Sequence, residues 1–170
     1  MSGQRRHAGL LVFFITLIMV GCQVPPTDIT TANKEVVREY LAALDAQDFT
    51  TLSELLVEDC VIHLPDGTDR VGRDAAFQVI RGFYTSFPDY THGIEEMIAE
   101  GDLVAVRVKY GGTHQGHFLG VAPTGRQVDY AGMFFMTVAD GVLTEVWFID
   151  DDLNLMSQLG MEVVPKGSLD

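Results

Sequence analysis

The sequence predicts an α+β fold in which helices come first and a sheet of long strands follows. Between residues 33 and 85, apolar residues recur at the spacing of amphipathic helices. From residue 91 to residue 150, the chain is rich in β-branched and aromatic residues and is divided by short turns. Three helices followed by consecutive strands indicate one antiparallel sheet with helices packed on it.

The predicted helices have recognisable ends. Asp48 is placed to accept hydrogen bonds from the first turn of the second helix. The third helix ends before Pro88, because the residue that precedes a proline is driven out of the helical region. The helices are expected at 33–45, 48–56, 73–85 and 153–159.

The strands are expected at 60–64, 91–99, 103–114, 127–138 and 142–150. Tight turns at 99–102 and 139–141 join neighbouring long strands. Both faces of strand 142–150 are largely apolar, which predicts a central strand covered on both sides.

Three consecutive acids, Asp150, Asp151 and Asp152, follow this apolar run. A carboxylate at the end of a buried strand loses hydration, so its pKa rises and it becomes a usable base near neutral pH. The alternative is that the acids only charge and cap the helix at 153–159. The spacing leaves both interpretations open and does not separate the three acids from one another.

Composition excludes several classes of function. The 170 residues include 24 acidic and 11 basic ones, for a net charge of −13, which opposes nucleic-acid binding. We find no nucleophile elbow, phosphate loop or dinucleotide fingerprint, and therefore expect no cofactor. His114 and His117 are close in sequence but lack a third metal ligand at a definable spacing, so we expect no metal site.

The N-terminus has the pattern of an export signal. Arg5 and Arg6 precede an apolar run at 10–20, which is too short for the roughly 20 residues of a membrane span but fits a secretory signal. Met19-Val20-Gly21-Cys22 resembles the lipobox of bacterial lipoproteins, which implies cleavage before Cys22 and acylation of that residue. We therefore expect a signal peptide at 1–21, a tether at 22–31, one domain at 32–162 and a tail at 163–170. The mature protein would be lipid-anchored in the bacterial cell envelope, facing outside the cytoplasm.

Several short motifs lie along the domain in a specific order. They are Gly72-Arg73-Asp74-Ala75, Phe87-Pro88-Asp89, Gly112-Thr113-His114-x-Gly116-x-Phe118-x-Gly120, Pro123-Thr124-Gly125-Arg126, and Glu145-x-Trp147-x-x-x-Asp151 followed by Gln158-Leu159-Gly160. This pattern resembles the SnoaL-like polyketide cyclase (ester cyclase) family over residues 33–161. The resemblance implies a nuclear transport factor 2-like cone, in which three N-terminal helices close a strongly curved antiparallel sheet over an apolar cavity.

The resemblance also implies site residues. Asp151 takes the acid/base role and His114 the role of the second catalytic residue. His114 is in phase with the apolar face of its strand, although a core histidine bonded to the backbone would fit the same pattern. Asp150 and Asp152 do not match the motif and are expected in solvent, and His92 is expected on the surface. The expected pocket residues are His63, Tyr110, Phe118, Phe134, Met136 and Trp147.

The leading hypothesis is a cofactor-independent enzyme that acts on a small hydrophobic carbonyl compound. Asp151 would remove a proton next to the carbonyl group, and His114 would stabilise the developing oxyanion or return a proton. The alternative is a membrane-anchored binding module that holds an apolar ligand in the same cavity without catalysis. Isomerase or epoxide hydrolase chemistry is a third option that the superfamily implies. We also expect a homodimer, paired through the uncovered face of the sheet.

The substitution Cys22→Ser tests the lipoprotein assignment. The change removes the acylated sulfur, so the protein should remain unprocessed or be released from the membrane. Metabolic labelling with a radioactive fatty acid and membrane fractionation measure the two effects. A wild-type protein that takes up no fatty acid and fractionates as soluble would contradict the assignment.

Overall fold

The structure is a computed structural model that describes residues 28–162 and residue 164. Its described part has four helices and a six-stranded sheet, which confirms the α+β class. The elements, in chain order, are α1 (Ile29–Asp45), α2 (Phe49–Leu55), β1 (Leu56–His63), β2 (Asp69–Val71), α3 (Arg73–Ser86), β3 (Thr91–Glu100), β4 (Leu103–Thr113), β5 (Gln127–Ala139), β6 (Val142–Asp150) and α4 (Asp152–Leu159).

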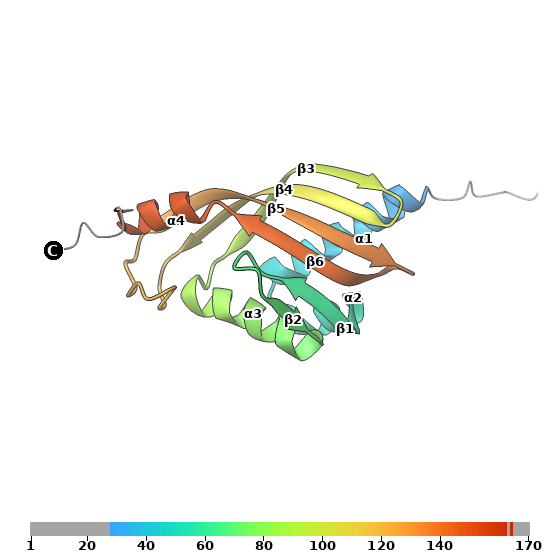
Figure 1. The fold of residues 1–170 in the computed structure, drawn as a ribbon, viewed down its shortest axis with the longest axis horizontal. Helices are drawn as coiled ribbons and strands as arrows, with labels where there is room; N and C mark the ends of the chain where they lie inside the picture. The colour runs from blue at the N-terminus through green and yellow to red at the C-terminus, as the bar shows by residue number, and fades with distance from the viewer. Residues whose placement is uncertain (1–27, 163, 165–170) are drawn as a thin grey trace, which may run out of the picture.

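The strands form one sheet in the order β2-β1-β6-β5-β4-β3 (Figure 1). Strands β3 to β6 make the predicted antiparallel meander. The sheet as a whole is mixed, however, because β1 runs parallel to β6, with Ile62 opposite Val146. The prediction of a purely antiparallel sheet is therefore wrong. These two strands are far apart in sequence, so no tight hairpin forces them to run in opposite directions.

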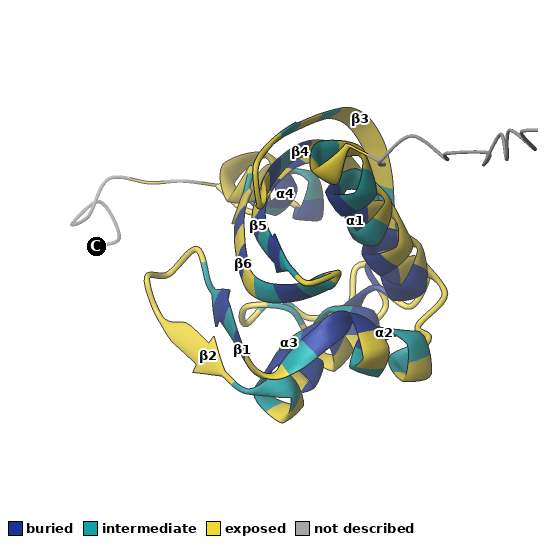
Figure 2. Cartoon of the chain, turned by 90° about the vertical axis from the view of Figure 1, so that its right-hand side faces the viewer, coloured by how far each residue is buried: buried dark blue, intermediate teal, exposed yellow. Residues whose placement is uncertain are grey.

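The helices do not form one N-terminal block. Strands β1 and β2 separate α3 from α2, and α4 follows the sheet. The predicted arrangement of three N-terminal helices is therefore not confirmed as stated, and the strong curvature of the sheet stays a prediction. Helix α1 lies against β3, β4 and β5, while α3 lies against β1 (Figures 1 and 2).

Helix starts agree with the capping residues that the sequence offers. The side chain of Asp48 accepts hydrogen bonds from the backbone N–H groups of Thr50 and Thr51, which confirms the predicted N-cap of α2. Asp28 caps α1 in the same way, so the helix begins at Ile29 and residues 29–31 of the expected tether are helical. None of the described helices has the length and apolar character needed to cross a membrane, and the predicted signal peptide lies outside the described residues.

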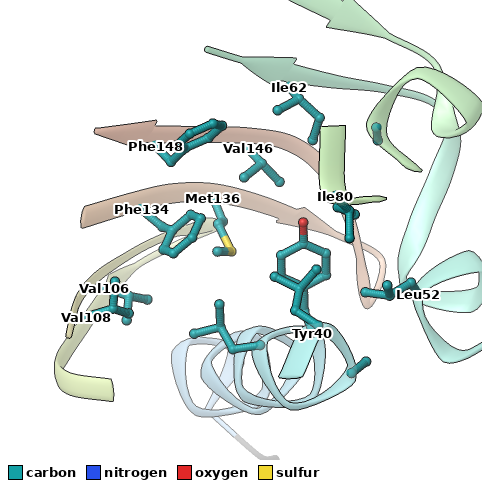
Figure 3. Close-up of a cluster of buried hydrophobic side chains, with 14 of the residues drawn as sticks. Tyr40, Leu52, Ile62, Ile80, Val106, Val108, Phe134, Met136, Val146 and Phe148 are labelled. Carbon is teal, nitrogen blue, oxygen red and sulfur yellow. The ribbon is translucent and has the colours of Figure 1, made fainter. Parts of the chain in front are cut away.

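Buried and exposed residues alternate along β4, β5 and β6 (Figure 2). The inner face of these strands meets the helices and forms the core. Figure 3 shows inner-face side chains of β5 and β6 directed toward those of α1 and α3: Phe134, Met136, Val146 and Phe148 face Tyr40 and Ile80.

The outer face of the same strands has no covering element among the described residues. Trp147 and Ile149 of β6 are 52% and 62% exposed, and Phe135 of β5 is 45% exposed. The prediction that β6 is covered on both sides is therefore wrong. An apolar face does not reveal whether its partner is a helix of the same chain or something else.

The substitution Met136→Ala tests the core assignment. The Met136 side chain is fully buried, so its truncation should lower the free energy of unfolding by about 2–5 kcal/mol. Met133, on the outer face of the same strand, is 49% exposed and provides a matched control. Chemical denaturation of both variants should show a much smaller loss for Met133→Ala, and equal losses would contradict the assignment of the two faces.

Candidate active site

A mostly apolar cavity lies between α1, α3 and the inner face of the sheet. The empty space between its walls is at most ≈ 520 Å³, a figure that includes the part open to solvent. Tyr110 and Phe134 line it, as predicted. The titratable side chains in its wall are Tyr40, Tyr84, Tyr90, His92, Tyr110 and Asp150.

Asp150 is the carboxylate of this cavity. Successive side chains of a strand point to opposite faces, so Asp150 shares the inner face of β6 with Val146 and Phe148. It is the last residue of the strand and lies opposite Gly132 of β5. Its neighbours along the strand are therefore apolar, and its oxygens lie at the cavity wall.

Gly132 makes room for the contact between Asp150 and Tyr110. A Cβ atom added at position 132 would lie 2.2 Å from Cε2 of Tyr110 and 2.9 Å from Oδ1 of Asp150. Any larger residue would therefore displace the Tyr110 ring or the carboxyl group. The absence of a side chain at this position brings a phenol and a carboxyl group together at the cavity wall.

The environment of Asp150 changes its proton affinity. Burial raises the pKa of its carboxyl group to about 7, against a partial lowering by the Tyr110 hydroxyl and a small further rise from the charge of Asp152. Its Oδ1 atom is buried and makes no hydrogen bond to a described residue. Asp150 is thus partly ionised near neutral pH, which is the condition for giving and taking protons there.

Asp151 lies outside the cavity. Its side chain accepts a hydrogen bond from the backbone N–H of Asn154 at 3.1 Å and is the N-cap of α4. The residue is exposed, because it continues the outward alternation of Trp147 and Ile149. The catalytic role of Asp151 remains a prediction, but its placement in the cavity is corrected. The expectation that Asp150 is in solvent is wrong for the same reason.

His114 is fully buried, as its phase predicts, but it does not line the cavity. The Thr124 backbone N–H donates to its Nδ1 at 3.3 Å, which assigns the proton to Nε2. The ring packs on Phe87, with centroids 5.2 Å apart. The structure therefore does not bring His114 and Asp151 together in the cavity, and His114 fits the alternative of a core histidine bonded to the backbone.

His63 and Trp147 are on the outer side of the sheet. Their rings stack with centroids 3.6 Å apart, and Nδ1 of His63 lies 2.8 Å from an Asp69 oxygen. The prediction of both as pocket residues is corrected: each lies next in sequence to an inward residue, Ile62 or Phe148, and so points outward.

Two further predicted pocket residues lie behind the cavity wall. Met136 is part of the core that surrounds the cavity. Phe118 packs against Phe83 and Phe87, with ring centroids 5.8 and 5.2 Å away. Of these aromatic residues only Phe83 lines the cavity, so Phe118 supports the wall without forming it.

His92 is a cavity residue that the sequence did not reveal. Its side chain is only 6% exposed and its Nδ1 lies 2.6 Å from Oδ1 of Asp45. The prediction of His92 as a surface residue is wrong. The two residues are 47 positions apart and no motif includes either of them, so only the packing of α1 on β3 joins them.

Buried tyrosines complete the polar part of the wall, and Tyr130, which does not line the cavity, supports them. The rings of Tyr90 and Tyr110 stack 5.3 Å apart, and the hydroxyl groups of Tyr90 and Tyr130 are hydrogen-bonded. Burial raises the pKa of all three phenols, so they stay neutral and can donate hydrogen bonds at ordinary pH. The hydroxyl of Tyr84 is buried without a hydrogen-bond partner among the described residues.

Comparison with known proteins identifies the family. Residues 34–159 match the model of the SnoaL-like polyketide cyclase family. The chain belongs to this family. A search of curated proteins found no match.

Several solved structures resemble this chain in fold and sequence. IdmH of Streptomyces antibioticus, a candidate polyketide cyclase, is 34% identical, with a TM-score of 0.70 over 76% of this chain and 99% of IdmH. A candidate SnoaL-like polyketide cyclase of Jannaschia sp. CCS1 is 26% identical, with a TM-score of 0.75 over 81% and 97% of the two chains. AclR of Streptomyces galilaeus, a candidate hydroxylase, is 28% identical, with a TM-score of 0.70 over 81% and 91%.

The substitution Asp150→Asn tests the environment of the carboxyl group. Because the pKa is about 7 in the folded protein and near 4 in the unfolded chain, folding binds protons. The contribution of Asp150 to the free energy of unfolding is therefore fully present below pH 4. It is lost as the pH rises through 7, and the free energy of unfolding falls by an amount on the order of 4 kcal/mol. Asp150→Asn should remove this loss, which unfolding experiments at several pH values will measure.

Asp151→Asn is the matched control for that experiment. Asparagine is as good an N-cap as aspartate, so this variant should keep the pH dependence of the wild type. An Asp150→Asn protein that loses stability between pH 4 and pH 7 as steeply as the wild type would contradict the buried position of the carboxyl group.

Proposed function

We propose that this protein is a cofactor-independent acid/base enzyme that removes a proton from the carbon next to the carbonyl group of a small hydrophobic compound. Asp150 is the base. The observation that supports this function is a carboxyl group with a pKa of about 7 at the wall of an apolar cavity. A base is most effective when its pKa is near the working pH, since it is then both available and strong.

The residues around Asp150 suit the second half of this reaction. When the proton leaves carbon, the electron pair moves onto the carbonyl oxygen, which becomes negative. The neutral hydroxyl of Tyr110 lies beside Asp150 and can donate a hydrogen bond to that oxygen. A fixed donor in a cavity with little water stabilises such a charge more than water does.

The relatives support carbon chemistry of this kind. IdmH is a candidate polyketide cyclase and covers most of the domain at 34% identity. A carbanion formed next to a carbonyl group can attack a second carbonyl group of the same molecule and close a ring. We therefore propose ring closure, or a related proton transfer, as the reaction, with Asp150 in the role that the motif assigned to Asp151.

The binding module remains the second candidate. The apolar wall and the aromatic side chains of Phe83, Phe134 and Phe148 would hold a hydrophobic ligand without any chemistry. A binder gains nothing from a carboxyl group that is partly charged and has a buried oxygen without a hydrogen-bond partner, which favours the enzyme.

Deuterium exchange into 2-tetralone separates the two candidates. This bicyclic ketone is small, hydrophobic and acidic at the carbon next to its carbonyl group. In heavy water the wild type should speed the exchange, and Asp150→Asn should slow it at least about 100-fold, as measured by proton NMR. Asp151→Asn should exchange like the wild type. Binding of 2-tetralone with no exchange above buffer would support the binding module.

We also propose that the domain works outside the cytoplasm on a lipid anchor and pairs with a second copy. The N-terminal motif with Cys22 supports the anchor. The outer face of the sheet supports the dimer, because Phe135 and Trp147 lie opposite each other on β5 and β6 and are half exposed. Met133, Ile149 and Leu103 extend this apolar surface.

The substitution Phe135→Glu tests the dimer. It places a charge in the centre of the apolar outer face, so the dissociation constant of the dimer should rise at least about tenfold. The cavity on the other face should be unchanged. Sedimentation equilibrium of residues 28–170 measures the association. A wild-type protein that is monomeric at every concentration would contradict the proposal.

A further inference from the structure

We propose that His92, oriented by Asp45, is a second catalytic residue of the cavity and exchanges a proton with the oxygen atom of the substrate. This inference rests on the proposed function, in which Asp150 exchanges a proton with carbon. It assigns to His92 and Asp45 a part in the reaction that no sequence motif indicates.

The position of His92 is fixed by one carboxylate oxygen. Oδ1 of Asp45 receives the backbone N–H of His92 at 3.0 Å and lies 2.6 Å from its Nδ1. A carboxylate accepts hydrogen bonds, so Nδ1 carries a proton. Asp45 is the last residue of α1, and the pair therefore ties the end of this helix to the start of β3. Both the ring orientation and the tautomer follow from this contact.

The other ring nitrogen is available to a ligand. Nε2 of His92 makes no hydrogen bond to a described residue. The ring lines the cavity, and the side chain is 6% exposed. Nε2 is not among the buried polar atoms that lack a partner, so it remains accessible from the cavity and a ligand oxygen can reach it. A core histidine such as His114 has no cavity beside it, and the pair of His63 and Asp69 lies on the outer face.

Tyr110 connects the two proton-transfer groups. It lies opposite His92 on the neighbouring strand, with ring centroids 5.3 Å apart, and its phenol is beside Asp150. The order along the wall is thus His92, Tyr110, Asp150. The reacting carbon and the oxygen of a carbonyl substrate are separated only by the carbonyl carbon, so a substrate on the Tyr110 side of the cavity would present its carbon to Asp150 and its oxygen toward His92.

The proton balance is complete with these two groups. The Asp150 carboxylate takes a proton from carbon, the C–H electron pair forms the carbon–carbon double bond, and the carbonyl π pair moves to oxygen. The doubly protonated His92 gives its Nε2 proton to this oxygen, which forms the enol, while the Nδ1 proton stays on the ring beside Asp45. In the reverse direction, neutral Nε2 takes the enol proton, and Asp150 returns its proton to carbon.

The test compares deuterium exchange into 2-tetralone by the wild type, His92→Gln and Asp45→Asn. His92→Gln should lower kcat about 10- to 100-fold and leave KM within about threefold, because proton transfer is lost and the apolar contacts remain. Asp45→Asn should also lower kcat, since it replaces the charged carboxylate beside Nδ1 with a neutral and weaker acceptor. His63→Gln is the matched control, an aspartate-paired strand histidine outside the cavity, and should exchange at the wild-type rate.

Chemical rescue distinguishes catalysis from a structural role. The exchange rate of His92→Ala should rise with added imidazole, and should not rise with 1,3-dimethylimidazolium, which has a similar shape but no N–H group. Wild-type exchange by His92→Gln, or a slow His92→Ala that imidazole does not restore, would overturn the inference.

A second measurement needs no variant. In wild-type protein labelled with 15N-histidine, 2-naphthol, which has the shape of the enol of 2-tetralone, should shift the Nε2 resonance of His92 and leave that of His63 unchanged. An unchanged His92 resonance at saturating 2-naphthol would overturn the inference. Wild-type protein without exchange refutes the proposed function, and the nitrogen spectrum then still decides whether His92 contacts the ligand oxygen. Exchange that depends on Asp150 and not on His92 refutes only this inference.

Discussion

The site depends on one constraint: within residues 28–162, the helices cover one face of the sheet and leave the outer face of its central strands open. Because side chains alternate along a strand, the residues of β6 from Val146 to Asp150 are assigned in turn to the helix-covered face and to the open one. Phe148 and Asp150 fall on the covered face, and Trp147 and Ile149 on the open one. A shift of β6 by one residue would put Trp147 into the cavity and Asp150 into solvent. The register of this strand therefore determines which acidic residue lines the cavity.

Burial of Asp150 then raises the pKa of its carboxyl group. Tyr110 reaches it only across the bare backbone of Gly132, and the apolar wall excludes the water that would otherwise stabilise the charge. A partly ionised carboxyl group with a buried oxygen that lacks a hydrogen bond lowers the free energy of unfolding at neutral pH. Such opposition between stability and reactivity is common at sites maintained for chemistry.

Most of the fold could be predicted from the sequence, because the patterns that define its helices, caps and turns lie in neighbouring residues. The periodicity of α1, the cap at Asp48 and the turns between the long strands all lie within a few residues of the elements that they define. The parallel pairing of β1 with β6 was not readable, since the two strands approach each other only in the tertiary structure. The three-residue strand β2 was missed because it is too short to show a pattern.

The site was only partly readable. Tyr110 and Phe134 follow from strand phase, but β6 is apolar on both faces, so alternation could not say which of its two faces turns inward. The motif pointed to Asp151, one residue from the acid that lines the cavity. The contact of His92 with Asp45 had no sequence signal at all, because an isolated histidine in a strand and an aspartate at a helix end are both common on surfaces.

The connection between β4 and β5 has two parts that differ in their tolerance of insertions and deletions. Its first residues are joined to the end of α3: the N–H groups of Gln115 and Gly116 both donate to the Ser86 carbonyl, and a Cβ at Gly116 would lie 2.2 Å from the carbonyl oxygen of Thr85. Beyond Phe118, residues 119–125 are largely exposed. Length changes before Phe118 should therefore be damaging. After it they should be tolerated best at 122–123, because Val121 pairs with Phe118, and Thr124 and Gly125 bond to His114. Length variation at 122–123 would therefore change the exposed end of this connection without rebuilding the core.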